Sequence, residues 1–540
     1  MQGLMQDYPL TLPPILTRAE RLYPDKTIVT ATCRGLIRTT YRDWAAETRR
    51  LGTVLDTLDI SPDGRVGSLA WNTAHHLALY WAAPCSGRVL HTLNPRLFSD
   101  QLRYVIRHGG DEAIFVDRSL VAVLSPHLKD LDAVRHIVVM NDGSDAEIPD
   151  DPRIADYDTL IATAVPAEFA VTEENRAAAM CYTSGTTGNP KGVLYSHRAL
   201  YLHAMSALLP SSIWTCERDT VLPVVPMFHA NGWGYAQSPL FVGANLVFPG
   251  PDLSPPAIAA LLQSERVTVT AGVPTVWMGM LPLLEQYDLS SLRLIVCGGS
   301  AASRSLSEAY REKLGVPLTH AWGMTETTPL GSVSLLRSTD IGRPEDELAA
   351  QRARQGTPPP GVEARIVEPG GTDELPWDDE ATGELQVRGP WIAASYYNDD
   401  RDEESFTPDG WLRTGDVAAI DRFGSIRLVD RTKDLVKSGG EWISTVELEN
   451  LLMGHPAVAE AAVIAVPHPR WQERPLACVV LAEGQSATKE ELLEHLRGKV
   501  AKWWLPDDVV FIEAVPRTSV GKFSKKDLRV RFADYQLPTL

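Results

Sequence analysis

The chain has 540 residues, of which 44% are hydrophobic and 22% charged, and these values exclude a disordered or fibrous protein. A chain of this length exceeds the size at which one hydrophobic core keeps growing, so at least two domains are expected. The net charge of −18 excludes a surface that attracts nucleic acid or anionic lipid in bulk, so any anion site must be locally basic.

The first ~170 residues alternate helical and strand patterns, as mostly parallel sheets covered by helices do. The spacing predicts a helix over 41–58, strands over 65–70 and 113–116, and an acidic surface loop over 142–151. The apolar run 177–182 reads as a further strand. A second α/β unit is expected after it, with strands over 221–225, 245–248, 267–271 and 292–297 and a helix over 301–310.

After residue 356 the chain turns into β-like segments, and strands are predicted over 364–367, 383–387 and 425–429. Beyond a linker, the order is helix 446–453, strand 459–466, strand 476–481, helix 489–505 and strand 509–515. These residues form a compact α+β domain of about 100 residues. The sequence thus predicts an α/β protein with a large N-terminal domain (1–430), a linker (431–437) and a smaller C-terminal domain (438–540).

The cysteines at 33, 85, 181, 216, 297 and 478 are dispersed, without a C-x-x-C pair, which favours a reduced, cytoplasmic chain with mostly buried thiols. The histidines lack zinc-site spacing and stand in no triad motif, so a structural metal and a catalytic thiol are disfavoured. The N-terminus has no signal-peptide pattern. No apolar run approaches ~18 residues, so no membrane span is expected.

Residues 182–192, YTSGTTGNPKG, form the most informative segment of the chain. Glycines let backbone N–H groups approach an anion, hydroxyls add donors, and the lysine adds a mobile positive charge. The segment is not a Walker A loop, because Pro190 precedes the lysine and Gly192 follows it. We interpret it as a phosphate-binding loop delivered by the strand before it.

This loop resembles the phosphate-binding signature of the adenylate-forming superfamily, which includes acyl-CoA synthetases, peptide-synthetase adenylation domains and firefly luciferase. Four further segments match the family's motifs in the family's order: THAWGMTET at 319–327, TGD at 414–416, DRTKDLVKSGG at 430–440 and PRTSVGK at 516–522. Trp322 stands where the family usually has tyrosine. The resemblance covers nearly the whole chain and is nearest to bacterial medium- and long-chain fatty acyl-CoA synthetases. It implies two sheet-containing units and a β-rich subdomain in the large domain, and a mobile C-terminal domain.

The resemblance implies a ligase that uses ATP and Mg²⁺ to convert a fatty acid to its coenzyme A thioester through an acyl-adenylate, releasing AMP and pyrophosphate. A short, methylthio-substituted or aromatic acid is the alternative substrate, and a catalytically silent nucleotide-binding regulator is an alternative of another class. A peptide-synthetase module and a luciferase are less favoured, since no carrier domain follows and no motif marks oxygenation. Small-molecule substrates, rather than nucleic acid or a membrane, are the expected partners, and a homodimer is left open.

The family's nucleotide contacts carry over to eighteen positions: Thr183, Ser184, Gly185, Thr186, Thr187, Gly188, Lys191, Gly299, Ser300, Ala301, His320, Ala321, Trp322, Gly323, Thr325, Asp416, Arg431 and Lys437. The small residues at 298–302 leave a slot for a flat base, and the two carboxylate oxygens of Asp416 suit the ribose hydroxyls. Thr183 and Glu326 are the implied Mg²⁺ ligands, which fits the preference of this ion for oxygen.

Lys522 is the implied catalytic cation, acting with Glu326, and Lys433 occupies the family's hinge position. Lys525 and Lys526, which follow Lys522 closely in the chain, are expected to be solvated surface residues. Ser438, Gly439 and Gly440 are implied to contact coenzyme A, and Lys437 and Trp442 to border the nucleotide or the pantetheine path.

The acyl site is implied by the segment VPMFHANGW at 225–233, with His229, Trp233, Gly298 and Trp442 as substrate contacts. In the resembled group a tryptophan at the position of Trp233 gates the acyl tunnel, but a buried tryptophan is also common in cores. Val273, Trp277 and Met278 are expected on the same wall. An apolar lining predicts an apolar acid.

Overall fold

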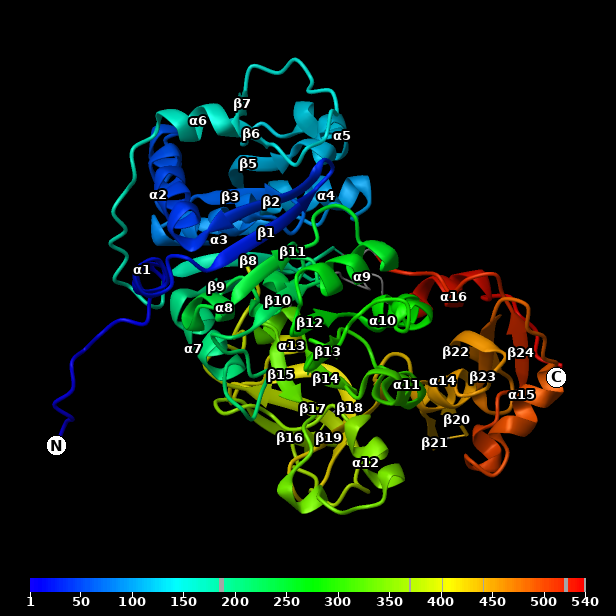
Figure 1. Ribbon diagram of the computed structural model, residues 1–540. Helices are drawn as coiled ribbons and strands as arrows, with labels where there is room; N and C mark the ends of the chain where they lie inside the picture. Colours follow the sequence, from blue (N-terminus) through cyan, green and yellow to red (C-terminus); the bar gives the residue numbers. More distant parts are fainter. Residues whose placement is uncertain (184–188, 369–370, 401, 440, 519–522, 539–540) are drawn as a thin grey trace.

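The computed structural model describes residues 1–183, 189–368, 371–400, 402–439, 441–518 and 523–538. Three sheets lie in the larger part of the molecule, and a fourth lies in a smaller part made by the C-terminal residues (Figure 1). The predicted α/β fold with two mostly parallel sheets, a β-rich subdomain and a separate C-terminal unit is confirmed.

The first sheet has seven strands in the order β7-β6-β5-β3-β4-β8-β9. Every neighbouring pair is parallel except β8 and β9. Its strands are β3 (Arg65–Leu69), β4 (Val89–Thr92), β5 (Asp111–Asp117), β6 (His136–Met140), β7 (Ile154–Asp156), β8 (Ala177–Tyr182) and β9 (Gly192–Ser196).

The second sheet has eight strands in the order β15-β14-β13-β12-β10-β11-β1-β2, and only its two edge pairs are antiparallel. Its strands are β1 (Thr27–Thr32), β2 (Gly35–Thr40), β10 (Thr220–Pro223), β11 (Asn245–Phe248), β12 (Val269–Gly272), β13 (Leu294–Gly298), β14 (Leu318–Gly323) and β15 (Leu330–Val333).

Helices fill the space between these two sheets and cover their outer faces. The helices are α1 (Pro13–Leu22), α2 (Tyr41–Thr57), α3 (Ala74–Cys85), α4 (Ser99–Gly109), α5 (Val121–Leu124), α6 (Tyr157–Thr163), α7 (His197–Ala207), α8 (Ser238–Val242), α9 (Pro255–Ser264), α10 (Pro274–Met280) and α11 (Arg304–Leu314). Helix α3 is buried along its length from His76 to Cys85, as expected for a helix that is apolar on every side. It packs in one core with strands of both sheets, while α9 to α11 cover the far face of the second sheet.

The third sheet is antiparallel and forms the β-rich subdomain, with strands β16 (Glu363–Val367), β17 (Gly383–Arg388), β18 (Leu412–Ile420) and β19 (Ile426–Arg431). Helices α12 (Glu345–Arg352) and α13 (Asp402–Ser405) lie in the connections before and within it. Strand β18 was not predicted, and it carries the T-G-D segment 414–416. The segment 431–437 is not a free linker, since Arg431 ends β19 and Val436 begins the next strand.

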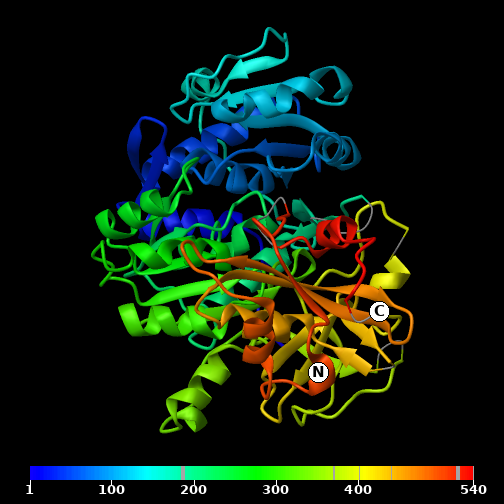
Figure 2. The same ribbon diagram turned by 90° about the vertical axis from the view of Figure 1, so that its right-hand side faces the viewer.

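The C-terminal unit has one sheet of strands β20 (Val436–Ser438), β21 (Glu441–Ile443), β22 (Val458–His468), β23 (Gln472–Leu481) and β24 (Asp508–Phe511), with helices α14 (Thr445–Met453), α15 (Lys489–Leu496) and α16 (Lys525–Arg531). Residues of α14 and α15 pack in one core and Leu528 of α16 in another. The predicted helix 489–505 is wrong beyond Leu496, because the chain turns there and Gly498 adopts φ +76°. Figure 2 shows this unit in front of the second sheet and the β-rich subdomain.

Candidate active site

One large cavity lies where the second sheet, the β-rich subdomain and the C-terminal unit meet. Its volume of about 650 Å³ is ordinary for a small-molecule site. It opens at the carboxyl ends of β13 and β14, where parallel α/β sheets commonly bind ligands. The predicted site residues that line it are Thr183, Lys191, His229, Trp233, Gly299, Ser300, Ala301, His320, Ala321, Trp322, Gly323, Thr325, Glu326, Asp416, Arg431 and Lys433.

The predicted phosphate loop connects two paired strands of the first sheet, β8 and β9. Its two ends are fastened to each other: Thr183 N donates to Lys191 O at 2.9 Å, and Lys191 N donates to Thr183 Oγ1 at 3.1 Å. Ser184, Gly185, Thr186, Thr187 and Gly188 lie outside the described residues, so their phosphate contacts stay predictions.

Lys191 presents a positive charge to the cavity. Its Nζ lies 4.3 Å from the centre of the Tyr396 ring and donates to Ser405 Oγ at 3.3 Å. Among the described carboxylates none lies within ion-pair distance of it. Because Lys191 contacts an aromatic ring and a hydroxyl rather than a described carboxylate, its positive charge can attract an anionic ligand such as a phosphate.

Glu326 is a buried carboxylate on the cavity wall, 6% exposed. Tyr396 OH donates to its Oε1 at 2.7 Å, and burial together with the Glu326 charge raises the pKa of that phenol. No described lysine, arginine or histidine forms an ion pair with Glu326, and a buried carboxylate without a cation is costly. The Glu326 carboxylate and the Thr183 hydroxyl are oxygen ligands of the kind that Mg²⁺ prefers. They would hold this ion, and the ion would neutralise phosphate charge in the reaction.

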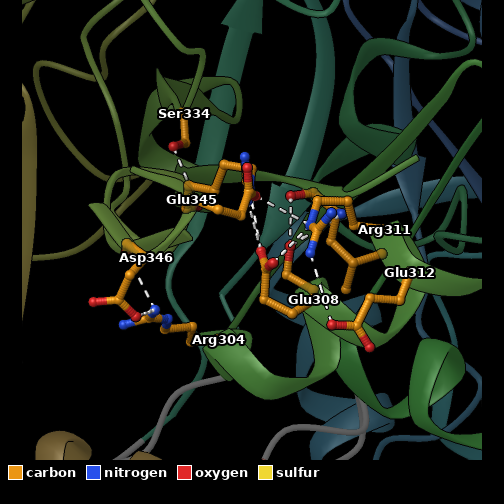
Figure 3. Close-up of polar contacts among 10 residues, drawn as sticks. Arg304, Glu308, Arg311, Glu312, Ser334, Glu345 and Asp346 are labelled. Carbon is orange, nitrogen blue, oxygen red and sulfur yellow. Dashed lines mark hydrogen bonds and ion pairs between the residues drawn. The ribbon is translucent and has the colours of Figure 1, made fainter. Parts of the chain in front are cut away.

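The predicted slot for the base lies between β13 and α11. Gly299, Ser300 and Ala301 line the cavity, and the side chain of Ser303 accepts from Leu306 N to begin α11. Helix α11 is fixed in turn to α12 by an ion-pair network (Figure 3). In it, Arg311 lies 2.7 Å from Glu308 and 3.2 Å from Glu345. The network therefore sets the position of the helix that follows the slot.

Three further contacts extend this network. Arg352 of α12 bonds Glu308 of α11 at 2.9 Å, and Arg304 forms an ion pair with Asp346. Ser334 donates to the carbonyl of Arg352 at 3.2 Å, which ties α12 to the chain beyond β15. Ion pairs gain from such networks more than they do singly.

Trp322 and Asp416 form the wall beside the slot. The Trp322 indole donates to Asp416 Oδ2 at 2.9 Å, and Arg431 Nε lies 2.7 Å from Asp416 Oδ1. Each carboxylate oxygen keeps a second lone pair for a hydroxyl, so the predicted ribose contact remains open. The Trp322 ring, which is larger than the tyrosine usual in the resembled family, fits because residue 331 is glycine. A Cβ there would lie 2.3 Å from the indole.

His320 lies behind the base slot in neutral form. It is 4% exposed, and burial lowers its pKa to about 4. Its Nδ1 lies 3.4 Å from Gln355 Nε2, and Gln355 Oε1 accepts from Leu428 N at 2.5 Å. His320 thus links the second sheet to the β-rich subdomain.

Trp233 lies in a turn with left-handed backbone. Ala230, Asn231, Gly232, Trp233 and Gly234 all have φ between 44° and 77°. Left-handed conformation costs roughly 1–2 kcal/mol for each non-glycine residue, so the surrounding structure must hold this turn.

The Trp233 ring lies against Gly298 at the end of β13. A Cβ on residue 298 would come within 2.6 Å of the carbonyl oxygen of Ala321 and within 3.0 Å of the Trp233 ring, and these two contacts explain the glycine at that position. Met278 shares the cavity wall as expected. Trp277 does not, because it is 1% exposed and packs in the core outside the second sheet, and Val273 is absent from the lining residues as well.

The predicted hinge residue, Lys433, lies between two anchored neighbours. Thr432 N donates to Gly415 O of β18 at 3.0 Å, and Asp434 accepts from Arg529 Nη1 of α16 at 2.7 Å. Burial and the nearby Arg431 guanidinium lower the pKa of Lys433. Residue 432 is therefore fixed to the large domain and residue 434 to the C-terminal unit.

The structure does not bring every predicted contact to the cavity. Of the described residues, the predicted ones missing from its lining are Gly298, Lys437, Ser438, Gly439 and Trp442. Lys437 Nζ lies 5.5 Å from the Trp442 ring, which is 44% exposed. Gly440 and Lys522 lie outside the described residues, although Thr518 and Phe523, on either side of Lys522, line the cavity. The contacts of these residues to coenzyme A and to the transition state stay predictions.

Sequence reasoning missed several residues of the cavity. The expectation for Lys525 is wrong: its side chain is 12% exposed and lies 2.8 Å from Glu449, whereas Lys526 is exposed as expected. Tyr396 and Gln355 also escaped notice. No local pattern marks any of them, because each gains its role from a partner far away in the chain.

Comparisons with known proteins agree with this geometry. Residues 16–397 match the AMP-binding enzyme family, and residues 447–522 match the AMP-binding enzyme C-terminal domain. The chain is 43% identical to a 3-methylmercaptopropionyl-CoA ligase of Ruegeria lacuscaerulensis over 99% of both chains. It is 44% identical to a long-chain-fatty-acid–CoA ligase of Thermus thermophilus, covering 98% of this chain and 97% of that one.

A solved structure resembles the whole fold. The anthranilate CoA ligase AuaEII in complex with anthranoyl-AMP superposes with a TM-score of 0.86 at 26% identity, covering 98% of this chain and 99% of that one. The described helices include none long and apolar enough to cross a membrane. The chain belongs to the AMP-binding enzyme family, and it is an acyl-CoA ligase that joins a carboxylic acid to coenzyme A through an acyl-adenylate, using ATP and Mg²⁺.

Proposed function

We propose that the substrate acid has a linear apolar tail and is a medium- to long-chain fatty acid. The observation that carries this proposal is the set of apolar side chains that line the cavity together with Trp233, namely Ile213, Pro274, Met278, Val296 and Leu306. A second charge on the acid would be left unpaired against such a wall, which is costly.

The cations that line the cavity belong to other elements than these apolar side chains do. Lys191 follows the phosphate loop, Arg413 and Arg431 belong to the β-rich subdomain, and Lys433 and Lys525 lie in or after the hinge. This division between elements supports ATP beside the cations and the acyl tail beside the apolar side chains, with the carboxylate between them.

The second candidate is a short methylthio-substituted acid. Its support is the 43% identity to the 3-methylmercaptopropionyl-CoA ligase, which is nearly equal to the identity with the long-chain ligase. A thioether is as compatible with an apolar wall as a methylene chain, and Met278 adds a soft sulfur contact.

A panel of acids decides between them. The acids are acetate, octanoate, palmitate, 3-methylthiopropanoate, benzoate and malonate, and the measured quantity is kcat/KM for thioester formation. We expect octanoate or palmitate to exceed acetate at least 100-fold, since each buried methylene contributes about 0.8 kcal/mol. A maximum at 3-methylthiopropanoate would select the second candidate, and a maximum at malonate or benzoate would contradict the apolar linear site.

We also propose a cytoplasmic enzyme, supported by six free cysteines of which Cys85, Cys181, Cys297 and Cys478 are buried. The large and small domains are proposed at 1–430 and 438–540 with the hinge at Lys433, supported by the anchoring of residues 432 and 434. A homodimer remains a proposal for which sedimentation analysis is the test.

A further inference from the structure

The strand that leads into the hinge is bonded directly to the helix that follows it. Asp430 in β19 is 3% exposed, and its Oδ2 accepts from both Thr445 N and Thr445 Oγ1 at 2.6 Å. Ser444 also donates to the carbonyl of Val429, at 2.5 Å. Both contacts join residues before Lys433 to residues after it.

The chemistry of the Asp430 contact is favourable. Thr445 is the first residue of α14, and Ser444 is its N-cap. The first N–H groups of a helix lack partners inside the helix and carry partial positive charge. A carboxylate that accepts from such a group forms a charge-assisted hydrogen bond, which is stronger than a neutral one.

The two partners of this bond belong to different domains. Asp430 pairs with Val417 in the antiparallel ladder of β18 and β19, so it moves with the large domain. Thr445 belongs to the core of the C-terminal unit through Leu448 and Leu452 of the same helix. A rotation about Lys433 would separate them.

The same threonine also holds the segment that carries Lys522. Lys525 Nζ donates to Thr445 Oγ1 at 2.5 Å and lies 2.8 Å from Glu449 Oε1. Glu449 is fixed in turn by Val463 N at 2.7 Å. Lys525 begins α16, three residues after Lys522. A chain of contacts thus runs from Asp430 through Thr445 to Lys525 beside the predicted catalytic lysine.

We propose that Asp430 is a positioning residue that latches the N-terminus of α14 onto the large domain and so holds the C-terminal unit in the arrangement for adenylation. The latch is made while Thr518 and Phe523 line the cavity and is released when the unit rotates for thioester formation. The inference rests on the proposed two-step function and names a residue that none of the motif contacts includes.

The test compares Asp430→Ala, Asp430→Asn and Thr445→Val with the wild type in single-turnover assays of each half-reaction. Adenylation is followed as pyrophosphate release from ATP and whichever acid the wild type uses best. Thioester formation is followed from preformed acyl-adenylate and coenzyme A. The matched control is Asp527→Ala, which removes an exposed carboxylate from the first turn of α16 inside one domain.

We expect Asp430→Ala to slow adenylation 10- to 100-fold and to leave thioester formation within threefold of the wild type. Asp430→Asn, which keeps an acceptor oxygen, should recover part of the adenylation rate. Thr445→Val should share the selective defect although Thr445 does not line the cavity, and Asp527→Ala should show none.

Equal losses in both half-reactions, or an unchanged adenylation rate in Asp430→Ala, would overturn the latch. A thermal unfolding scan of each variant separates a folding defect from a positional one, and Thr445→Val provides the independent reading if Asp430→Ala does not fold. Failure of the proposed substrate is distinguishable, because it would appear in the wild type as a different preferred acid.

Discussion

The Asp416 carboxylate bonds two protein side chains and is also predicted to bond the ribose. Its two oxygens each accept one bond from the protein, from Trp322 and from Arg431, and each retains a lone pair for a ribose hydroxyl. The protein contacts fix the carboxylate, so the predicted ribose contact would need little further ordering. Trp322 keeps the aromatic face of the family's tyrosine, and its indole N–H donates to Asp416.

Lys522 is the residue on which the chemical step depends most in this account. We predict that Lys522→Ala slows adenylation at least 100-fold and leaves thioester formation from preformed acyl-adenylate nearly intact, because phosphoryl charge develops only in the first step. Single-turnover measurements of both half-reactions check this. Equal losses in the two steps would contradict the assignment.

Trp233 is predicted to set the acyl chain-length profile. Its ring lies on Gly298 in a left-handed turn, and such strain is commonly found where function imposes a position. Trp233→Ala should change the ratio of kcat/KM between octanoate and palmitate more than it changes the KM for ATP. Trp277→Ala is the control, since that tryptophan lies in the core. A lowered thermal stability with an unaltered profile would return Trp233 to a packing role.

At the scale of elements, the proposed hinge lies between two anchored segments. The turn at 431–435 is closed by Leu435 N, which donates to Arg431 O at 3.0 Å. A hinge works when one or two residues absorb a large change in φ and ψ, and Lys433 is the residue between the anchors of Thr432 and Asp434.

We predict that Lys433→Pro allows substantial acyl-adenylate formation and nearly abolishes thioester formation, because proline fixes φ. Acyl-adenylate should then accumulate on the enzyme, and mass spectrometry of bound and released products measures it. Lys433→Ala removes the charge while keeping the backbone free, so it should turn over far better than the proline variant. Normal thioester turnover by Lys433→Pro would place the hinge elsewhere.

Elements with a strong local pattern were predictable from the sequence. Strands 177–182 and 245–248 have the predicted bounds, because each is a short apolar run between turn-forming residues. Strand β18 escaped because Gly415 interrupts its pattern, and glycine weakens strands in general. The helix predicted to residue 505 ended early at Leu496, since the sequence pattern did not reveal the turn at Gly498.

The motifs predicted the residues that line the cavity better than the residues that hold those side chains in place. Motif residues such as Glu326 and Asp416 line it as expected, whereas Tyr396 holds Glu326 from a position 70 residues away. Lys525 looked like a surface lysine because its partners, Thr445 and Glu449, come from another helix. Long-range partners of this kind leave no local signal.

At the scale of the whole molecule, buried histidines couple stability to pH. Burial lowers the pKa of His76, His197, His203 and His320 to about 4, against about 6.5 in an unfolded chain. Each stabilises the fold fully above pH 6.5 and loses this contribution as the pH falls toward 4, by up to about 3 kcal/mol. Buried Asp117 and Glu449 act in the opposite sense, because burial raises their pKa values to about 8 and about 7.

Comparing the pH dependence of unfolding between the wild type and a histidine variant isolates the contribution of that histidine from those of Asp117 and Glu449. We predict that His203→Gln loses less free energy of unfolding than the wild type between pH 7 and pH 5, because it carries one fewer group that protonates on unfolding. Urea unfolding at the two pH values measures this. An equal loss in both proteins would show that His203 is not neutral in the fold.

We propose that the acyl-adenylate forms in the cavity beside Lys191 and Glu326. The most direct measurement incubates the enzyme with ATP, Mg²⁺ and octanoate or palmitate, first without coenzyme A and then with it, and identifies every product by mass spectrometry. We expect about one equivalent of bound acyl-AMP and of pyrophosphate before coenzyme A is added, and stoichiometric AMP and acyl-CoA afterwards. Formation of ADP and phosphate, or pyrophosphate release that does not depend on the acid, would contradict it.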